Sequence, residues 1–327
     1  MQFDDFIHAL PKAELHLHFE GAVPWDMVQK HAPKATPNVP PWWKHDFKFD
    51  DFRDFGQVMR ACFAYVLTDL NRYHDMARVI FAGLAAQNVR YVETSFSLEF
   101  ASSITTQLSD IVTAIKTAAP KDMVVKVFCG INRGENHPLT DPMIESIFQA
   151  DNLDGIDLHG DERLRKPQPF ADIFAKAQAQ GLMTKAHAGE LIGPQSIWDA
   201  LDHLHVKRIE HGATAIFDED LMERLALQEV TLDLCPTSNL KLQVVDKITD
   251  HPIRYFHEHG IKVTVNSDDP TIFGCTLSQE LTLLVKKLGF SPADLAQLQM
   301  NAFEVADMAD SQRQAIRDEL KTLTAAL

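Results

Sequence analysis

The chain is 327 residues long, 45% hydrophobic and 24% charged, which is an ordinary composition for a globular protein with a substantial core. Acidic residues outnumber basic ones by 46 to 31, and the net charge of −15 argues against nucleic acid as a partner, because nucleic-acid binders need a basic face. No apolar run reaches membrane-spanning length, and the first residues lack the basic and apolar regions of a signal peptide. We therefore expect a cytoplasmic protein with no membrane or nucleic-acid partner.

The four cysteines are far apart and form no Cys-x-x-Cys motif. This pattern argues against a disulfide framework and favours buried thiols in a reducing compartment. The cysteines are Cys62, Cys129, Cys235 and Cys275.

The stretch Glu14–His18 predicts a short buried strand. Because side chains alternate across a strand, His16 and His18 project from the same face. Two imidazole nitrogens aimed at one point are half of a metal site. The spacing alone does not select this pair, because the chain has two more of the kind, His203/His205 and His257/His259.

The next segments predict a helix and then an irregular region. A helix is expected to begin at Pro24-Trp25. Residues 32–46 are too rich in proline for a regular helix, so they predict a loop or a lid.

Two further regions have helical patterns. The first begins near Phe49 and runs to about Ala86, and its residues Phe52 and Phe55 fit either core packing or the wall of a pocket. The second is the amphipathic tail at residues 291–327.

From residue 89 onward, short apolar and β-branched runs alternate with helix-like stretches. Alternation of this kind implies parallel strands with crossover helices, and eight such units favour a closed (β/α)8 TIM barrel over an open doubly wound sheet. We expect a single domain over residues 1–327, with extra helices after the first strand and at the C-terminus. No glycine-rich dinucleotide or phosphate motif follows any strand. After the first strand, the predicted strands are Val89–Ser95, Met123–Ile131, Leu153–His159, Leu182–His187, Val206–His211, Val230–Cys235 and Ile261–Ser267.

Unusual polar residues gather where the predicted strands end. In a barrel, the carboxyl ends of the strands form the face that carries the active site. Groups far apart in the sequence are therefore expected to meet at one mouth. The polar strand ends are His16–His18, Asp157–Glu162, His187–Glu190, Glu210–Gly212, Cys235–Asn239 and Ser267–Pro270.

Three imidazoles and one carboxylate at this face suit one Zn²⁺ ion per chain, with a coordination position left for water. Such an ion lowers the pKa of its water toward neutrality and makes hydroxide available. A two-metal site would need a bridging carboxylated lysine at the end of the fourth strand, and Lys185 lies on the fifth, so one metal is expected. The four candidate ligands are His16, His18, His187 and Asp268.

The same face supplies groups for proton transfer. Glu190 is placed to donate a proton to a substrate, and His211 and Asp269 to position and activate the water. His159, also at a strand end, is open to a role beside the metal or the substrate. The cytidine-type deaminase signature, His-x-Glu followed by Pro-Cys-x-x-Cys, is absent.

Taken together, these segments resemble the adenosine/adenine deaminase family of the metal-dependent amidohydrolase superfamily. The resemblance spans almost the whole chain, in the order of the family. It implies zinc-dependent hydrolytic deamination at C6 of a purine. The segments that carry it are Pro11–Gly21, Gly155–Glu162, Ala186–Glu190, Arg208–Gly212, Cys235–Asn239 and Ser267–Pro270.

The resemblance also implies individual roles. Glu190 matches the residue that protonates purine N1, and Gly160 matches the backbone N–H that binds N3. His211 and Asp269 match the pair that orients the attacking hydroxide and handles its proton. The zinc ligands implied are the same His16, His18, His187 and Asp268. Substrate contacts are expected from His18, Glu20, Gly160 and Asp269.

Glu20 bears on the choice among 6-aminopurines. Adenosine deaminases that this chain resembles usually have Asp at this position, beside the ribose, whereas Glu is common in the adenine deaminase branch. Gly155–Glu162 is similar to the adenosine branch instead, so we predict deamination of adenosine and 2′-deoxyadenosine, with adenine as the alternative. Aminodeoxyfutalosine, a larger nucleoside, is a third possibility, because Cys235–Asn239 and residues 267–274 resemble that branch. More remote alternatives are a non-catalytic purine-binding relative and an amidohydrolase acting on an ester, amide or triazine.

Overall fold

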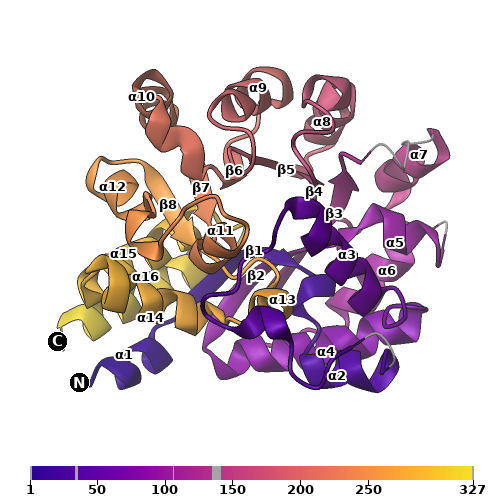
Figure 1. Cartoon of the computed structure of the whole chain (residues 1–327), viewed down its shortest axis with the longest axis horizontal. Coiled ribbons are helices and arrows are strands. Elements are labelled where there is room, and N and C mark those ends of the chain that lie inside the picture. Colours follow the sequence, from indigo (N-terminus) through magenta and orange to yellow (C-terminus); the bar gives the residue numbers. More distant parts are fainter. Residues whose placement is uncertain (1, 34–35, 106, 135–140, 326–327) are drawn as a thin grey trace.

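The computed structural model describes residues 2–33, 36–105, 107–134 and 141–325. Its eight strands are parallel and follow one another in chain order around a single sheet, with helices outside them (Figure 1). The prediction of a (β/α)8 barrel is therefore confirmed, and each predicted strand overlaps an observed one. The strands are β1 Lys12–His18, β2 Val89–Ser97, β3 Val124–Asn132, β4 Gly155–His159, β5 Met183–Ala188, β6 Arg208–His211, β7 Thr231–Leu234 and β8 Lys262–Val265.

The barrel closes between β8 and β1 through one residue of the candidate site. The backbone N–H of Asp268 donates to His16 O at 3.0 Å, and its carbonyl accepts from the N–H of His18, also at 3.0 Å. These two bonds flank Leu17, which forms an isolated parallel bridge with Asp268. The seam of the barrel thus holds the Asp268 carboxylate beside the two histidines of β1.

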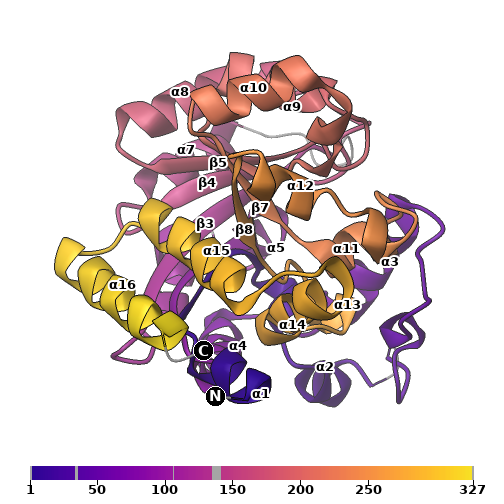
Figure 2. The ribbon, with the colours of Figure 1, turned by 90° about the vertical axis from the view of Figure 1, so that its left-hand side faces the viewer.

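Helices surround the sheet on its outer side. Figure 2 shows α8, α9 and α10 along one side of the barrel and α15 and α16 along another. The start of α1 and the end of α16 lie near each other in both views (Figures 1 and 2). The helices are α1 Phe3–Ala9, α2 Trp25–His31, α3 Phe52–Phe63, α4 Leu70–Ala86, α5 Leu98–Ser102, α6 Leu108–Lys116, α7 Asp141–Gln149, α8 Ala171–Ala179, α9 Gln195–Leu204, α10 Glu219–Leu227, α11 Pro236–Lys241, α12 Ile253–Glu258, α13 Pro270–Phe273, α14 Leu277–Leu288, α15 Pro292–Val305 and α16 Asp310–Ala325.

The prediction of one continuous helical region from Phe49 to about Ala86 is wrong. The region forms two helices, α3 and α4, and each starts at an aspartate N-cap. The Asp51 carboxylate accepts from the N–H of Asp54, and the Asp69 carboxylate accepts from the N–H of Arg72. Such caps satisfy backbone donors at a helix start, so Asp69 begins a new helix where the apolar pattern alone suggested continuation. The tail likewise divides into α15 and α16.

The described part of the proline-rich segment contains no α-helix, as predicted, and only one 3-10 turn, Pro41–Trp43. Trp42 is buried, and its carbonyl accepts from the buried ammonium of Lys241. The indole N–H of Trp43 donates to Thr271 O at 2.7 Å. The segment is therefore a loop fastened to α11 and α13, the helices that follow the last two strands. Residues 34–35 of this segment lie outside the described residues.

The four cysteines are free and buried, as expected from their spacing. Among the described helices, none combines the length and apolar character needed to cross a membrane.

Candidate metal centre and active site

Four side chains converge at the carboxyl ends of β1, β5 and β8. His16 and His18 come from β1, His187 from β5, and Asp268 from the turn just after β8. Their inward-facing atoms are the Nε2 atoms of the three histidines and Oδ1 of Asp268. The Nε2 atom of His187 lies 3.2 Å from that of His16 and 3.1 Å from that of His18. Asp268 Oδ1 lies 3.6 Å from His16 Nε2 and 3.4 Å from His18 Nε2.

These separations fit a small metal ion. Ligands about 2.0–2.1 Å from a tetrahedral zinc ion lie about 3.3–3.4 Å from one another, close to the four distances above. All four side chains are buried, and burial lowers the pKa of both His16 and His18 well below the usual value. The two rings are therefore neutral, which is the form that binds metals. Three imidazoles and a carboxylate form a donor set that suits Zn²⁺.

The Nδ1 atoms of His187 and His16, on the far side of each ring from Nε2, contact carboxylates and a backbone carbonyl. His187 Nδ1 lies 2.9 Å from Glu210 Oε2 and 3.2 Å from Asp157 Oδ1. His16 Nδ1 lies 3.3 Å from the carbonyl of Asp233. Metal-binding histidines commonly donate their second ring N–H in this way, which fixes the ring and leaves the other nitrogen for the ion. The sequence placed Asp157 and Glu210 at strand ends but gave them no role.

Lys185 is buried and forms an ion pair with Glu210, which also contacts His187. Its ammonium donates to Leu15 O at 2.9 Å and pairs with Glu210 Oε1 at 2.8 Å. Burial alone would lower the pKa of Lys185, but the negative charges of Glu210 and Glu93 outweigh burial and raise this pKa above its usual value.

Glu190, His211 and Asp269 surround the same point. His211 Nε2 lies 3.5 Å from Glu190 Oε1 and 3.8 Å from Asp268 Oδ2. Burial, together with the negative charge of Asp268, raises the pKa of Glu190 well above its usual value, although His187 opposes the shift. Burial and Asp268 likewise raise the pKa of Asp269. The site thus holds two carboxyl groups that bind protons strongly.

Asp269 occupies a space that exists because residue 21 is glycine. A Cβ atom on Gly21 would lie 1.8 Å from Asp269 Oδ1 and 2.6 Å from Asp269 Cβ. Oδ1 has no hydrogen-bond partner among the described residues, although it is buried. A buried polar atom without a protein partner is typical of a group that meets a ligand.

Two site residues adopt backbone conformations that L-amino acids rarely take. His211 has φ of 65° and Asp268 has φ of 62°. Such conformations cost about 1–3 kcal/mol each and occur often at functional sites. Here they turn one imidazole and one carboxylate toward the same centre.

Comparison with known proteins identifies the family. The model of the adenosine deaminase family matches residues 11–323. The chain belongs to the adenosine deaminase family. It is a hydrolase of the amidohydrolase superfamily that acts on a C–N bond, as the matching segments implied.

The deaminase is similar to relatives of two kinds. It is 31% identical over 323 residues to an adenine deaminase of Rhodospirillum rubrum, with 95% of each chain covered. It is 32% identical to an aminodeoxyfutalosine deaminase of Streptomyces coelicolor, with 98% of this chain and 86% of the relative covered.

Solved structures of relatives share the barrel. The adenine deaminase of Arthrobacter aurescens superimposes with a TM-score of 0.85 at 28% identity, covering 97% of this chain and 99% of the other. An amidohydrolase of Burkholderia ambifaria, solved with bound Zn, gives a TM-score of 0.84 at 28% identity, covering 98% and 93%.

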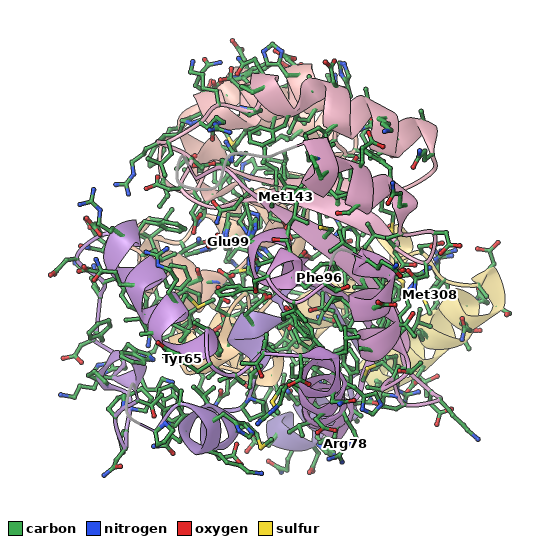
Figure 3. All side chains as sticks on the ribbon, turned by 90° about the vertical axis from the view of Figure 1, so that its right-hand side faces the viewer. Tyr65, Arg78, Phe96, Glu99, Met143 and Met308 are labelled. Carbon is green, nitrogen blue, oxygen red and sulfur yellow. The ribbon has the colours of Figure 1, made fainter. Side chains whose placement is uncertain are left out.

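A cavity of about 500 Å³ opens beside Gly160, at the end of β4 in the deaminase. Ser97 and Asn132 also line it, together with residues of α3 and α5. Figure 3 shows α3 and α5 side by side, with Glu99 of α5 labelled between them. Phe52 and Phe55 lie on the cavity wall, and Phe55 also stacks on Phe273 of α13, so the two predicted roles of this helix coexist.

Glu20 lies next to this cavity, because it is bonded to Ser97 of the cavity wall. It is buried, and its Oε1 accepts from the backbone N–H of Ser97 at 3.0 Å. Burial raises its pKa to about 7, and its charge in turn contributes to the raised pKa of Asp269.

Gly160 has φ of 93°, and a Cβ there would lie 2.6 Å from Asn132 Oδ1, so only glycine fits.

Glu162 was not predicted to act, yet it supports the turn that carries Glu190. Its Oε2 accepts from the backbone N–H groups of Glu190, Leu191 and Ile192 at 3.2, 2.7 and 3.3 Å. Its Oε1 accepts from Ser196 Oγ at 3.1 Å. Buried carboxylates that accept several backbone N–H groups fix a loop strongly.

The remaining histidines divide as expected. The two other His-x-His pairs lie at the ends of α9 and α12, away from the centre: His205 and His259 are exposed, and their partners are partly buried. His159 instead stacks on His18, with ring centroids 5.5 Å apart and planes 19° apart. It therefore helps to hold a metal-facing imidazole.

Proposed function

We propose that this protein is a zinc-dependent adenine deaminase, which converts adenine and water to hypoxanthine and ammonia. The observation that carries the proposal is the buried carboxylate of Glu20, held by Ser97 beside the substrate cavity. The similarity to adenine deaminases over nearly the whole chain supports the same choice. The proposal departs from adenosine, the substrate favoured by the segment Gly155–Glu162, and takes up the alternative that Glu20 indicated.

Glu20 favours a free base for a chemical reason. Free adenine carries an N–H on its five-membered ring, at N9 or N7, which a carboxylate can accept. A nucleoside has a ribose on N9 and no such hydrogen. A buried carboxylate left without its donor costs about 1–3 kcal/mol or more, and sites built to bind one N–H reject analogues that lack it.

Glu190 acts in this proposal as the general acid. Burial raises its pKa and so favours the protonated form, which can donate a proton to N1 of the ring. Protonation of N1 makes C6 electrophilic. The three backbone contacts from Glu162 to the turn keep the acid in place.

Asp269 acts as the proton acceptor. It acts in its unprotonated form, which its raised pKa makes a strong base for a carboxylate, and its Oδ1 has no partner among the described residues. It accepts a proton from the attacking water and transfers one to the amino group that leaves C6 as ammonia. Gly160 offers its backbone N–H to N3 of the ring.

The metal in the proposal is one Zn²⁺ ion, held by His16, His18, His187 and Asp268. When bound, it supplies water with a lowered pKa to the site. We further propose one metal-dependent deaminase domain over residues 1–327, acting in purine metabolism in the cytoplasm, where free thiols like the four cysteines persist.

A substrate panel tests the proposal. Steady-state kinetics of the zinc-loaded enzyme should give the highest kcat/KM with adenine, at least about 10²-fold above adenosine and 2′-deoxyadenosine. Glu20→Asp should narrow that ratio, because the shorter side chain leaves room beside N9. A higher kcat/KM for adenosine would reject the base assignment, and absence of turnover on every aminopurine would favour a non-catalytic relative or a different amidohydrolase.

Aminodeoxyfutalosine is a second candidate, favoured by the size of the cavity and by the Streptomyces relative. At about 500 Å³ the cavity exceeds the lower end, about 300 Å³, of ordinary ligand pockets, and Arg53 and Arg60 line it. Including this nucleoside in the panel separates the two, since preference for it over adenine would select the second candidate.

A further inference from the structure

The two ring nitrogens of His211 face different groups. Nε2 faces the reacting centre, toward Glu190 and Asp268. Nδ1 faces away from it and lies 3.1 Å from the side-chain Nδ2 of Asn239. A neutral imidazole has one hydrogen, and the nitrogen that carries it decides whether the ring donates to the centre or accepts from it.

A buried histidine next to Asn239 fixes the direction of this hydrogen bond. His251 Nδ1 accepts from the backbone N–H of Ile253 at 3.2 Å. Burial lowers the pKa of His251 to about 3, so its ring is neutral. Since Nδ1 is occupied as an acceptor, the single hydrogen of His251 lies on Nε2.

The direction then passes through Asn239. His251 Nε2 lies 3.1 Å from Asn239 Oδ1 and donates to it. The amide oxygen is thereby used, and the amide Nδ2, which can only donate, points to His211 Nδ1. His211 Nδ1 is therefore an acceptor, and its hydrogen lies on Nε2.

The other orientation of the Asn239 amide, with Oδ1 and Nδ2 exchanged, leaves a hydrogen bond unmade. It would turn the amide NH2 toward His251 Nε2, which would then have to accept. The hydrogen of His251 would have to sit on Nδ1, facing the N–H of Ile253, so two donors would meet. Both Asn239 and His251 are buried, so no solvent water replaces the missing bond.

We propose that Asn239 and His251 are positioning residues that hold His211 as an Nε2–H donor aimed at the reacting centre. In this form His211 donates a hydrogen bond to the attacking oxygen and cannot take its proton, so that task falls to Asp269. The sequence had given His211 and Asp269 a joint role, and the hydrogen-bond chain separates them. This inference rests on the hydrolytic reaction proposed above for its catalytic meaning, but the position of the hydrogen can be measured without turnover.

The first test observes the hydrogen directly in the wild-type protein. Proton–nitrogen correlation spectra of zinc-loaded protein with ¹⁵N-labelled histidine distinguish a ring nitrogen that carries hydrogen from one that does not. The His211 signals are assigned by their loss in His211→Gln. We expect a bare Nδ1 and a protonated Nε2, and the reverse pattern overturns the proposal even if no aminopurine is turned over.

The second test reverses the chain with Asn239→Asp. A carboxylate accepts from both rings, so it draws the His211 hydrogen to Nδ1. We expect kcat to fall about 10²-fold or more, as when a donor to the reacting oxygen is lost, with KM and zinc content unchanged. His251→Gln, which keeps a donor at the Nε2 position, should retain most of kcat, whereas His251→Ala should not.

The matched control for His251→Gln is His259→Gln, which replaces an exposed histidine by glutamine away from the site. Wild-type kcat and unchanged His211 spectra in Asn239→Asp would overturn the proposal. If that variant fails to fold, the spectra of the wild-type protein still decide the matter.

Discussion

Gly21 is expected to be essential because it makes room for Asp269. In Gly21→Ala the new methyl carbon would lie 1.8 Å from Asp269 Oδ1, 2.5 Å from its Cγ and 2.6 Å from its Cβ. Rotation of the carboxylate cannot relieve all three contacts, because Cβ does not move with χ2. The backbone of one of the two residues must therefore shift.

The size of the shift follows from the distances. Ordinary contacts of a Cβ atom begin near 3.4 Å, so the Asp269 carboxylate has to retreat by about 1.6 Å. Misplacement of a catalytic group by about 1 Å can cost about 10²-fold in rate. We expect kcat of Gly21→Ala to fall at least about 10²-fold, which corresponds to about 2.7 kcal/mol in the barrier.

The assay is steady-state release of ammonia from adenine, with zinc content and thermal unfolding measured on the same samples. Gly83→Ala is the matched control, because a Cβ at Gly83 of α4 meets nothing within 4 Å. This control should keep full activity and gain about 0.5–1 kcal/mol of stability, since alanine is the better helix former. A kcat of Gly21→Ala within threefold of wild type would refute the steric argument.

Two further substitutions address the acid. Glu162→Ala removes the acceptor of three backbone N–H groups, so kcat should fall more than KM changes, and the free energy of unfolding should decrease by about 3 kcal/mol or more. Hydrogen exchange of the backbone amides at residues 190–192 should accelerate in Glu162→Ala, and the effects of Glu162→Gln should be milder. Exchange at the wild-type rate in Glu162→Ala would contradict this role. Glu190→Gln should bind zinc but lose about 10²–10⁴-fold in kcat. Because Glu190 works in its protonated form and its pKa is raised, wild-type kcat should fall as pH rises through that raised pKa, and the residual activity of Glu190→Gln should lack this alkaline limb. The same limb in the variant would assign the acid elsewhere.

The barrel could be predicted because its signal is local. Each strand is a short buried run that alternates with a longer helical pattern, and eight such runs allow few other architectures. The helix boundaries were harder. The break before α4 depends on the capping bond of Asp69, which an apolar periodicity does not register.

The convergence of the candidate site residues was predictable where each one stands at the end of a strand. The histidines of β1 are brought to the others by barrel closure, and Asp268 makes that closure with its backbone. Residues that act through other residues were missed. Glu162 binds backbone N–H groups of the next loop, and Gly21 acts by lacking a side chain, so neither leaves a chemical pattern in the sequence.

His251 shows the same limitation more sharply. It follows no strand, and nothing in its neighbourhood in the sequence links it to the end of β6. Its contribution appears only when the bonds from Ile253 to Asn239 are followed in space.

Zinc titration of the apoprotein tests the central claim most directly. Protein stripped of metal is given increasing zinc while hypoxanthine formation from adenine is recorded. The four-ligand centre predicts no activity without metal and a linear rise to a plateau at one zinc per chain. Full activity without metal, a plateau only at two equivalents, or no hypoxanthine at any zinc concentration would contradict the account.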